Sequence, residues 1–421
     1  MTAPTRGLRR PAVLLLSPSL QGHRLIYCRV LAAIFARAGR DVVVAGDLRA
    51  DGVAGHPLLT GLRERSGVSV VDAGPAAAFS AAALPALLRD AGAEELFCAD
   101  ADDLIGDPAF TRAALPGVRT VGLYLRTTNY IYAARPPWLR RLWRRRHGRP
   151  EEEAFHEGGP AAVSPVDAAL VLDERFAAEH PLTHGWMPDI FREPDGGGER
   201  EETQRWRARV TEVLARAPRR PVVVYVGTNQ ERRGYDTLLR LAAEEDAVFL
   251  HCGRLEPHDG DRPEEVERLR ALLLERGALL ETAGPYVHPE TADVFLRAAT
   301  CVALPYRQHL GSSGVMLQAV AAGRPVVVPD EGLMAFRTTS FGLGATYPAG
   351  DEQALRRTFR ALLARRPEAY AARLRAFAAC FAPACVEAAV LAALTGSGPG
   401  AELPQHAFAV SSPAREETAW S

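Results

Sequence analysis

The sequence predicts an α/β protein of two doubly wound domains, each a parallel β-sheet covered by helices. Three observations support this class. The chain has 421 residues, 47% of them hydrophobic, which is enough for two cores. Short apolar runs alternate with helical segments through both halves, as in strands joined by crossover helices. Between the halves, the stretch PDGGGEREETQ replaces the apolar rhythm with glycine and charge, which is typical of a linker.

In the first half, six apolar runs have the length and composition of buried strands. A helix over residues 25–38 follows the first run and ends at Ala38-Gly39. Its apolar side is predicted to include Tyr27, Val30, Leu31, Ile34 and Phe35. The predicted strands are Ala12–Leu16, Asp41–Ala45, Val68–Val71, Leu96–Ala99, Thr120–Tyr124 and Ala168–Leu172.

The second half repeats the pattern from Pro221. We therefore expect a first domain over 1–185, a linker over 186–220 and a second domain over 221–395. Residues 396–421, rich in Gly, Pro, Ala and Ser, are expected to form a disordered tail. The predicted strands are Pro221–Val226, Ala247–His251, Leu279–Thr282, Cys301–Leu304 and Pro325–Val328.

Charge and composition exclude several classes of function. The formal net charge is -1, and no nucleic-acid motif is present, so we expect no nucleic-acid partner. The sequence contains no lysine, which excludes Schiff-base chemistry and a Walker-A phosphate loop.

The cysteines and the apolar runs indicate a compartment. Six scattered cysteines without a C-x-x-C pair suggest small core residues in a reducing environment. The N-terminal apolar run is too short for a signal peptide, and no uninterrupted apolar stretch is expected to span a bilayer. We therefore expect a cytoplasmic protein.

The stretch ATCVALPYRQHLGSSGVMLQAVAAGRPVVVPD, residues 299–330, is the most informative part of the chain. It predicts a strand, a turn at Gly311-Ser312-Ser313-Gly314, a helix over 315–322 and a second strand. Free backbone N–H groups at a helix N-terminus favour an anion, so a bound phosphate is predicted here. The alternative is an ordinary turn with a serine N-cap.

This segment resembles the donor-nucleotide half of a GT-B glycosyltransferase, most closely the retaining "glycosyl transferases group 1" type, in which E-x7-E precedes the turn. Leu310 and Gln318 stand where that pattern has its two glutamates. The resemblance implies that Gln318 contacts the donor ribose, since an amide still donates and accepts hydrogen bonds. It also leaves His309 either as a sugar contact or as a surface-loop residue.

The loop GTNQERRG, residues 227–234, resembles the family's G-R-x-x-x-x-K-G loop, whose cations neutralise the donor diphosphate. Thr228 replaces the arginine and Arg233 the lysine, with Arg232 adjacent. The resemblance thus implies that Arg233 neutralises charge on the departing diphosphate. The alternative is a solvated arginine pair at the start of a helix.

Other strand ends complete the expected donor site. Gly253 and Arg254 follow one strand, and Gly284-Pro285-Tyr286-Val287 resembles the family's nucleobase loop. Tyr286 either stacks on the base or packs on its own domain.

The first-domain loop SPSLQGH places Gln21, Gly22 and His23 on the acceptor side. In inverting GT-B enzymes a histidine here is the general base, whereas in retaining relatives the loop lines the cleft. A helix-capping role is the third option for His23.

The segment Arg135–Arg149, RPPWLRRLWRRRHGR, is the sharpest charge anomaly. As a helix it would gather tryptophan and leucine on one side among arginines, a pattern that suits an anionic membrane surface or a lipid-linked acceptor. Neutralisation by Glu151–Glu153 is the alternative.

Together these features predict a GT-B glycosyltransferase, with two Rossmann-like domains facing a central cleft, that moves a hexosyl-type sugar from a nucleotide-diphosphate donor to an acceptor hydroxyl with retention. No metal is expected, because no D-x-D motif follows a strand of the second domain. The alternatives are a non-catalytic nucleotide-sugar-binding protein, an inverting enzyme using His23, and a sugar-nucleotide epimerase. In GT-B proteins the last helices often return to the first domain, so the resemblance implies such a return here.

Overall fold

The fold was analysed in a computed structural model of the whole chain. The residues that the structure describes are 11–75, 78–102, 104, 107, 110, 114–126, 166–179, 184–191, 200–257, 260–282, 284, 287–365 and 367–396. The arginine-rich segment 135–149 and the expected tail after residue 396 lie outside these residues. The chain divides into two compact units. Unit 1 comprises Met1–Pro194 with Phe381–Pro404, and unit 2 contains Asp195–Cys380.

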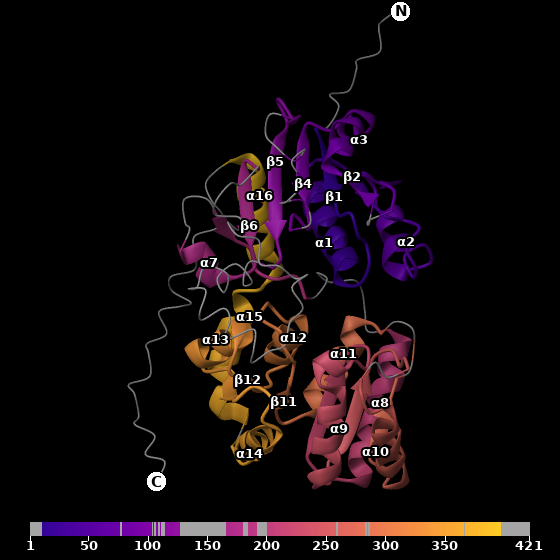
Figure 1. Cartoon of the computed structure of the whole chain (residues 1–421), viewed down its shortest axis with the longest axis vertical. Helices are drawn as coiled ribbons and strands as arrows, with labels where there is room; N and C mark the ends of the chain where they lie inside the picture. Colours follow the sequence, from indigo (N-terminus) through magenta and orange to yellow (C-terminus); the bar gives the residue numbers. More distant parts are fainter. Residues whose placement is uncertain are drawn as a thin grey trace, which may run out of the picture. The chain divides into compact units, whose positions relative to one another are not determined.

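Unit 1 contains a seven-stranded parallel sheet (Figure 1). Its order is β3-β2-β1-β4-β5-β6-β7, so the order reverses between β1 and β4. In register, Leu14 lies opposite Val43 on one side and Leu96 on the other. The strands are β1 (Ala12–Leu16), β2 (Asp41–Gly46), β3 (Val68–Asp72), β4 (Glu95–Cys98), β5 (Arg119–Tyr124), β6 (Ala168–Val171) and β7 (His184–Trp186).

The helices of unit 1 bury the apolar sides that the periodicity predicts. All five residues expected on the inner side of α1 are buried, and Phe35 packs against Phe97 of β4 with ring centroids 5.4 Å apart. The helical elements are α1 (His23–Arg37), α2 (Pro57–Arg63), η2 (Ala81–Ala83), α3 (Leu84–Ala91), α7 (Glu174–Glu179) and α16 (Pro383–Thr395).

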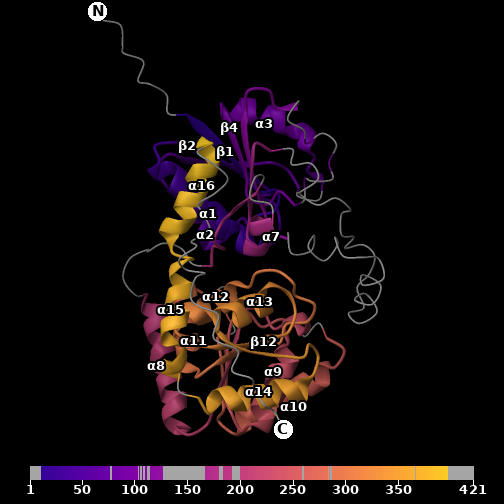
Figure 2. The same ribbon diagram turned by 90° about the vertical axis from the view of Figure 1, so that its left-hand side faces the viewer.

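The last helix, α16, is far from the rest of unit 1 in sequence but packs on it beside α1 (Figure 2). Arg37 pairs with Glu387 at 2.7 Å, and Arg119 donates to the Ala393 carbonyl at 2.8 Å. This is the return of the C-terminal helices that the resemblance implies. Helix α16 contacts β5, β6 and β7. Contact with all three strands accounts for the apolar side chains around most of its circumference.

One part of the sequence expectation needs correction here. By length and composition, Glu368–Thr395 contains a window apolar enough to cross a membrane, which the sequence reading did not identify. In the structure this stretch is divided into η5 (Pro367–Tyr370), α15 (Ala371–Ala379) and α16, with Pro383 at the start of α16. The buried side chains of α16 are in the core of unit 1. A core helix of a globular domain can be as long and as apolar as a membrane-spanning helix.

Unit 2 has two three-stranded parallel sheets, β10-β9-β8 and β11-β12-β13, and β8 lies against β11. The strands are β8 (Val222–Val226), β9 (Val248–Cys252), β10 (Leu279–Glu281), β11 (Val302–Ala303), β12 (Val326–Pro329) and β13 (Gly344–Tyr347). The helical elements are α8 (Glu201–Arg216), η4 (Glu231–Arg233), α9 (Tyr235–Glu244), α10 (Pro263–Glu275), α11 (Pro289–Ala298), α12 (Gly314–Ala321), α13 (Gly332–Phe341) and α14 (Glu352–Leu363), followed by η5 and α15.

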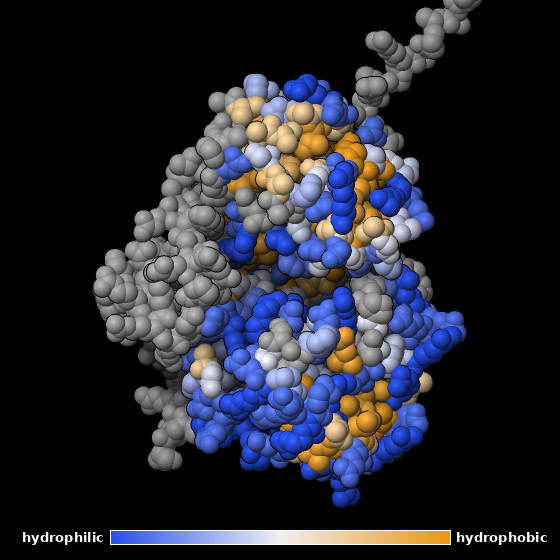
Figure 3. All heavy atoms as spheres, turned by 45° about the vertical axis from the view of Figure 1, so that its right-hand side comes forward, coloured by the Kyte–Doolittle hydropathy of each residue, from blue (hydrophilic) through white to orange (hydrophobic). Residues whose placement is uncertain are grey.

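The core of unit 2 is formed by side chains from β8, β9 and the helices α9, α10 and α14, including Tyr235, Phe249 and Phe359. Five of the six cysteines are buried, as expected for core residues, and Cys385 is half-buried. Among the described residues, Val71 and Leu274 are the exposed large hydrophobic side chains. Figure 3 accordingly shows a face with scattered hydrophobic patches among hydrophilic residues.

Several elements were not predicted, among them helix α8 and the strands β7 and β13. Helix α8 lies within the expected linker and packs on α11, where Trp206 meets Phe295 at 5.8 Å between ring centroids. Strand β13 begins at Gly344, at which a Cβ would lie 1.9 Å from the Val326 carbonyl oxygen, so only glycine lets the two strands pair this closely.

Candidate functional site

The candidate site of unit 2 lies where the strand order reverses, at the carboxyl ends of β8 and β11. Parallel α/β sheets bind ligands at this edge, because the loops on either side of the reversal diverge to opposite faces. The loop 227–234 follows β8, and the loop that ends in the turn at Gly311 follows β11. Tertiary contact between β8 and β11 therefore brings the two loops predicted to hold a phosphate to the same edge.

The β8–α9 loop is held against β9. Gly227 donates to the Cys252 carbonyl at 2.9 Å, and the Nε2 of the buried His251 lies 2.8 Å from the Gly227 carbonyl oxygen. Gly253 lies so close that a Cβ there would be 2.1 Å from the same oxygen. Gly227 itself has φ +119°, which favours glycine. The loop is therefore fixed in one conformation.

Arg233 is placed over this glycine. A Cβ at Gly227 would lie 2.5 Å from Arg233 Nη1. The Arg233 guanidinium is half-buried and makes no hydrogen bond or ion pair with any of the residues that the structure describes. A guanidinium that keeps its five N–H donors available at a ligand-binding edge is suited to an anion. Its neighbour Arg232 is exposed.

The predicted turn after β11 leads directly into α12. Ser313 is the N-cap, its Oγ accepting from Met316 N at 3.2 Å. The backbone N–H groups of residues 311–315 donate to none of the described residues. They lie at the positive end of the α12 dipole. The turn therefore has both the serine N-cap and the free backbone donors that the sequence analysis treated as alternatives.

His309 has a contact within the turn itself. Its Nε2 lies 3.0 Å from the Ser312 carbonyl oxygen, which can only accept, so Nε2 carries the proton. The ring also packs edge-on against Tyr306, with centroids 5.3 Å apart. Leu310 is buried, and its carbonyl accepts from Leu333 N at 2.9 Å. The residue that replaces the first glutamate is therefore part of the packing against α13.

The two loops are joined by Arg307. Its backbone N–H donates to the Arg232 carbonyl at 2.8 Å, and its guanidinium pairs with Glu231 and with Asp236, the latter at 2.8 Å. Gly234 lies against Pro305, where a Cβ would be 2.6 Å from the proline. These contacts fix Arg233 and the turn on one framework.

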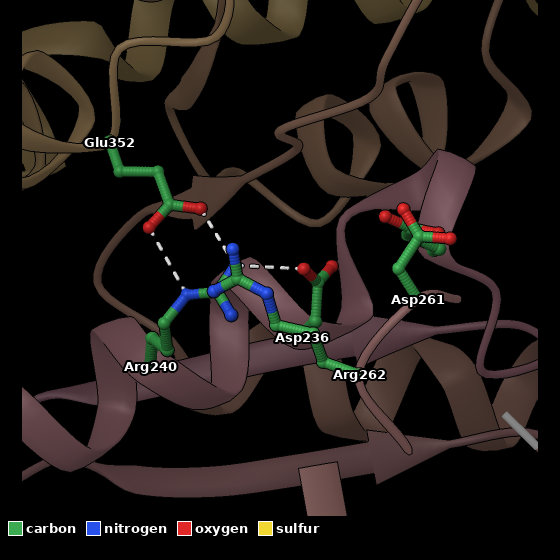
Figure 4. Close-up of a pocket in the computed structure, with 6 residues that line it drawn as sticks. Asp236, Arg240, Asp261, Arg262 and Glu352 are labelled. Carbon is green, nitrogen blue, oxygen red and sulfur yellow. Dashed lines mark hydrogen bonds and ion pairs between the residues drawn. The ribbon is translucent and has the colours of Figure 1, made fainter. Parts of the chain in front are cut away.

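A cavity of about 380 Å³ lies beside Glu231 and Asp236, the ion-pair partners of Arg307 (Figure 4). In Figure 4 Arg240 lies between Asp236 and Glu352, with which its guanidinium pairs at 2.8 Å in each case. The lining carboxylates outnumber the arginines, a balance that disfavours phosphate. We regard the cavity as part of the support for the loops. The lining residues are Glu231, Asp236, Arg240, Asp261, Arg262 and Glu352.

The remaining predicted donor residues are spread along the same strand ends. Thr228 accepts from Tyr225 Oη through its carbonyl at 2.5 Å, and Gln318 is half-buried on α12. Arg254 is exposed and pairs with Glu256 at 2.9 Å. Val287 is half-buried before α11, and Tyr286 lies outside the described residues.

Sequence reasoning missed His251, which sits in a buried polar network. Its Nδ1 lies 3.7 Å from Glu281, and Arg270 pairs with the same carboxylate at 2.7 Å. Burial alone would raise the pKa of Glu281, but the nearby His251 and the hydrogen bonds and charge of Arg270 lower it to about 2. The network keeps His251 in place under Gly227. A histidine inside an apolar strand, VFLHC, was the available signal.

In unit 1, the loop between β1 and α1 lies at the corresponding reversal of strand order. Gln21, Gly22 and His23 are exposed there, with His23 the first residue of α1 and its ring 5.8 Å from that of Tyr27. The next residue, Arg24, donates to the buried Asp100 at 2.5 Å.

A second buried carboxylate lies beside Asp100. Asp102 accepts from Leu125 N at 2.6 Å and from Arg126 N at 3.1 Å. Burial, and then the charge of Asp100, raise the pKa of Asp102 to about 7. Asp100 and Asp102 thus brace the loops that follow β1 and β5.

Residues 220–365 match the family profile described as Glycosyl transferases group 1. No curated protein matches the chain. Among solved structures, HepE from Anabaena in complex with UDP and glucose is similar with a TM-score of 0.58 and 14% identity, over 92% of this chain and 100% of that one.

Two further structures are similar. Sucrose-phosphate synthase from Thermosynechococcus elongatus has a TM-score of 0.55 and 18% identity, over 87% of this chain and 92% of that one. WaaG, a glycosyltransferase involved in lipopolysaccharide biosynthesis, has a TM-score of 0.55 and 13% identity, over 91% and 100%. At such identities the likeness shows the fold, which is GT-B, as the sequence predicted.

Proposed function

We propose that this chain, whose second unit is a glycosyl transferases group 1 domain on a GT-B fold, moves a sugar from a nucleotide-diphosphate sugar to an acceptor hydroxyl. Arg233 is the observation that carries the proposal. It is a half-buried guanidinium without a hydrogen bond or ion pair to the described residues, fixed over Gly227 at the edge where α/β sheets bind ligands.

The chemistry requires positive charge beside the leaving group. When the bond between the sugar C1 and the phosphate oxygen breaks, the electron pair stays on the diphosphate. The Arg233 guanidinium and the N–H groups of residues 311–315 are fixed donors for that charge. Since they are already held in place, little reorganisation is needed as the charge develops.

For the acceptor, we propose a hydroxyl held on the side of Gln21, Gly22 and His23. The acceptor oxygen forms the new bond to C1 on the face from which the phosphate leaves, which retains the anomeric configuration, and its proton passes to the departing phosphate oxygen. HepE is bound to UDP and glucose in its solved structure, so UDP-glucose is the first donor to test. We propose that no metal is needed, because guanidinium and amide donors supply the positive charge. We further propose a cytoplasmic location, with contact to an anionic membrane or lipid-linked acceptor through residues 135–149.

One observation favours a second candidate, a protein that binds a nucleotide sugar without turnover. Leu310 is 2% exposed and packed on α13, so its position offers no carboxylate to the sugar. Retained donor-phosphate contacts without that acid would give binding alone.

The test compares Arg233→Ala with Arg268→Ala, which removes an exposed arginine of α10. Transfer and hydrolysis are measured over a panel of nucleotide sugars and acceptors, and nucleoside-diphosphate binding by calorimetry. We expect Arg233→Ala to lower kcat/KM about 100-fold or more, the usual effect of losing one charge-stabilising donor, and Arg268→Ala to leave it unchanged.

Equal activity of the two variants would remove Arg233 from the mechanism. Binding without turnover across the panel would support the second candidate. An inverted product would contradict retention and direct attention to His23 as base.

A further inference from the structure

Arg337 is an arginine buried in the middle of unit 2. It lies on α13 and is 1% exposed, and it is among the largest fully buried side chains of the described residues. Arginine stays charged at any physiological pH. Burying that charge costs free energy unless nearby groups pair with it or accept its hydrogen bonds. Neither the glycine-rich loops nor the strand pattern predicted a cation at this position.

The guanidinium lies against the predicted phosphate turn. Arg337 Nη1 donates to Ser312 Oγ at 2.8 Å. The start of α13 is fixed to the same loop, because a Cβ at Gly332 would lie 2.7 Å from Leu310 Cα, and Leu333 N donates to the Leu310 carbonyl. Arg337 therefore has a fixed position relative to the turn.

The contact determines what the Ser312 hydroxyl can do. A serine hydroxyl has one O–H donor and accepts through its lone pairs. Arg337 takes an acceptor position on Ser312, while the cap of α12 is made by Ser313 and not by Ser312. The Ser312 hydroxyl donates to none of the described residues, and accepting from a cation makes its own proton a stronger donor.

We infer that Arg337 is a positioning residue for the leaving diphosphate: it holds the Ser312 hydroxyl as an oriented, polarised donor to the phosphate bound at the turn. It also places a second positive charge near the turn, where the loop pattern loses one at Thr228. This inference rests on the proposed function, since it assigns a role within the same donor site.

Binding of diphosphates and of the matched nucleosides separates this role from a purely structural one. The probes are UDP, GDP, ADP, CDP and dTDP, each with its nucleoside, measured by calorimetry on the full chain. The variants are Ser312→Ala, Arg337→Met and the double variant. Arg324→Met is the matched control, because Arg324 is half-buried and donates to the Arg297 carbonyl. It lies two residues before β12, at the opposite end of that strand from the turn.

We expect Ser312→Ala and Arg337→Met each to weaken the tightest diphosphate about tenfold, since each removes one charge-assisted donor. Nucleoside affinity and the Arg324→Met variant should stay within about twofold of wild type. The double variant should lose little more than either single one, because both changes interrupt the same chain of hydrogen bonds.

An additive loss of about 100-fold in the double variant would overturn the inference, as would equal losses for diphosphate and nucleoside. If Arg337→Met does not fold, Ser312→Thr decides: it keeps the hydroxyl and should retain affinity that Ser312→Ala loses, and equal affinity of the two overturns the inference. Wild-type protein that binds none of the five diphosphates would instead contradict the proposed function.

Discussion

Gly253→Ala tests the geometry that fixes the β8–α9 loop. The added Cβ would lie 2.1 Å from the Gly227 carbonyl oxygen and 2.5 Å from its carbon, although real Cβ atoms essentially never come within 3.0 Å. Both contacts are backbone atoms, so no side chain can turn aside. The Gly227 peptide must instead move by about 1 Å, which is a strained change in a close-packed region.

The size of the effect follows from the contacts at this point. Moving Gly227 breaks its hydrogen bonds with Cys252 and with His251, at 2.9 and 2.8 Å, each contributing about 1 kcal/mol. Overpacking strain adds about 1–3 kcal/mol. We therefore expect unit 2 to lose about 3–5 kcal/mol of unfolding free energy, or about 6–20 °C in Tm.

The measurement is thermal unfolding by calorimetry, with Gly311→Ala as the control. A Cβ at Gly311 meets no atom within 4 Å and its φ is not in the left-handed region, so its Tm should change by less than about 2 °C. A Gly253→Ala protein whose Tm lies within about 2 °C of the wild-type value would refute the reasoning, because the loops after β8 and β9 would then accommodate a methyl group for which the structure leaves no space.

Two further predictions concern pH and metal. The folded-state pKa of Asp102 is raised to about 7 from an ordinary 3.8, so its contribution to stability is complete below pH 3.8 and is lost as pH rises through 7. From pH 5.5 to 8, wild type should therefore lose about 2 kcal/mol of unfolding free energy relative to Asp102→Asn, measured by urea unfolding, and parallel pH profiles would contradict this. Sugar transfer should persist in excess EDTA, and activity that EDTA abolishes and Mg²⁺ or Mn²⁺ restores would contradict a metal-independent mechanism.

The strands were predictable because buried parallel strands are nearly continuous apolar runs. Ala12–Leu16 was predicted with its observed bounds, and the other ten expected strands differ from the structure by one or two residues at their ends. Helix α8 escaped because its sequence is polar around most of its circumference, with Thr203 and Val210 its buried residues. It is supported by packing on α11, which no local pattern reveals.

Part of the candidate site was also predictable. Glycines and serines at strand ends identified the loop at Gly227 and the turn at Gly311, because a strand, a glycine turn and a helix in succession leave backbone donors at one edge. Arg233 was found through the resemblance of its loop. His251 and Arg337 were not found, because a polar side chain within an apolar strand or helix gives no indication of its partner in sequence.

The sequence by itself determined the α/β class, the strands and the loops that carry free backbone donors, since these depend on local periodicity and on glycine. Only the tertiary structure decided which charges meet those loops. Arg307 joins the loop of Arg233 to the turn, and Arg337 reaches Ser312 from a helix that begins beyond the next strand. Such contacts depend on strand order and on the packing of α13, which bring together residues far apart along the chain. A local sequence pattern does not indicate which distant residue will lie beside it.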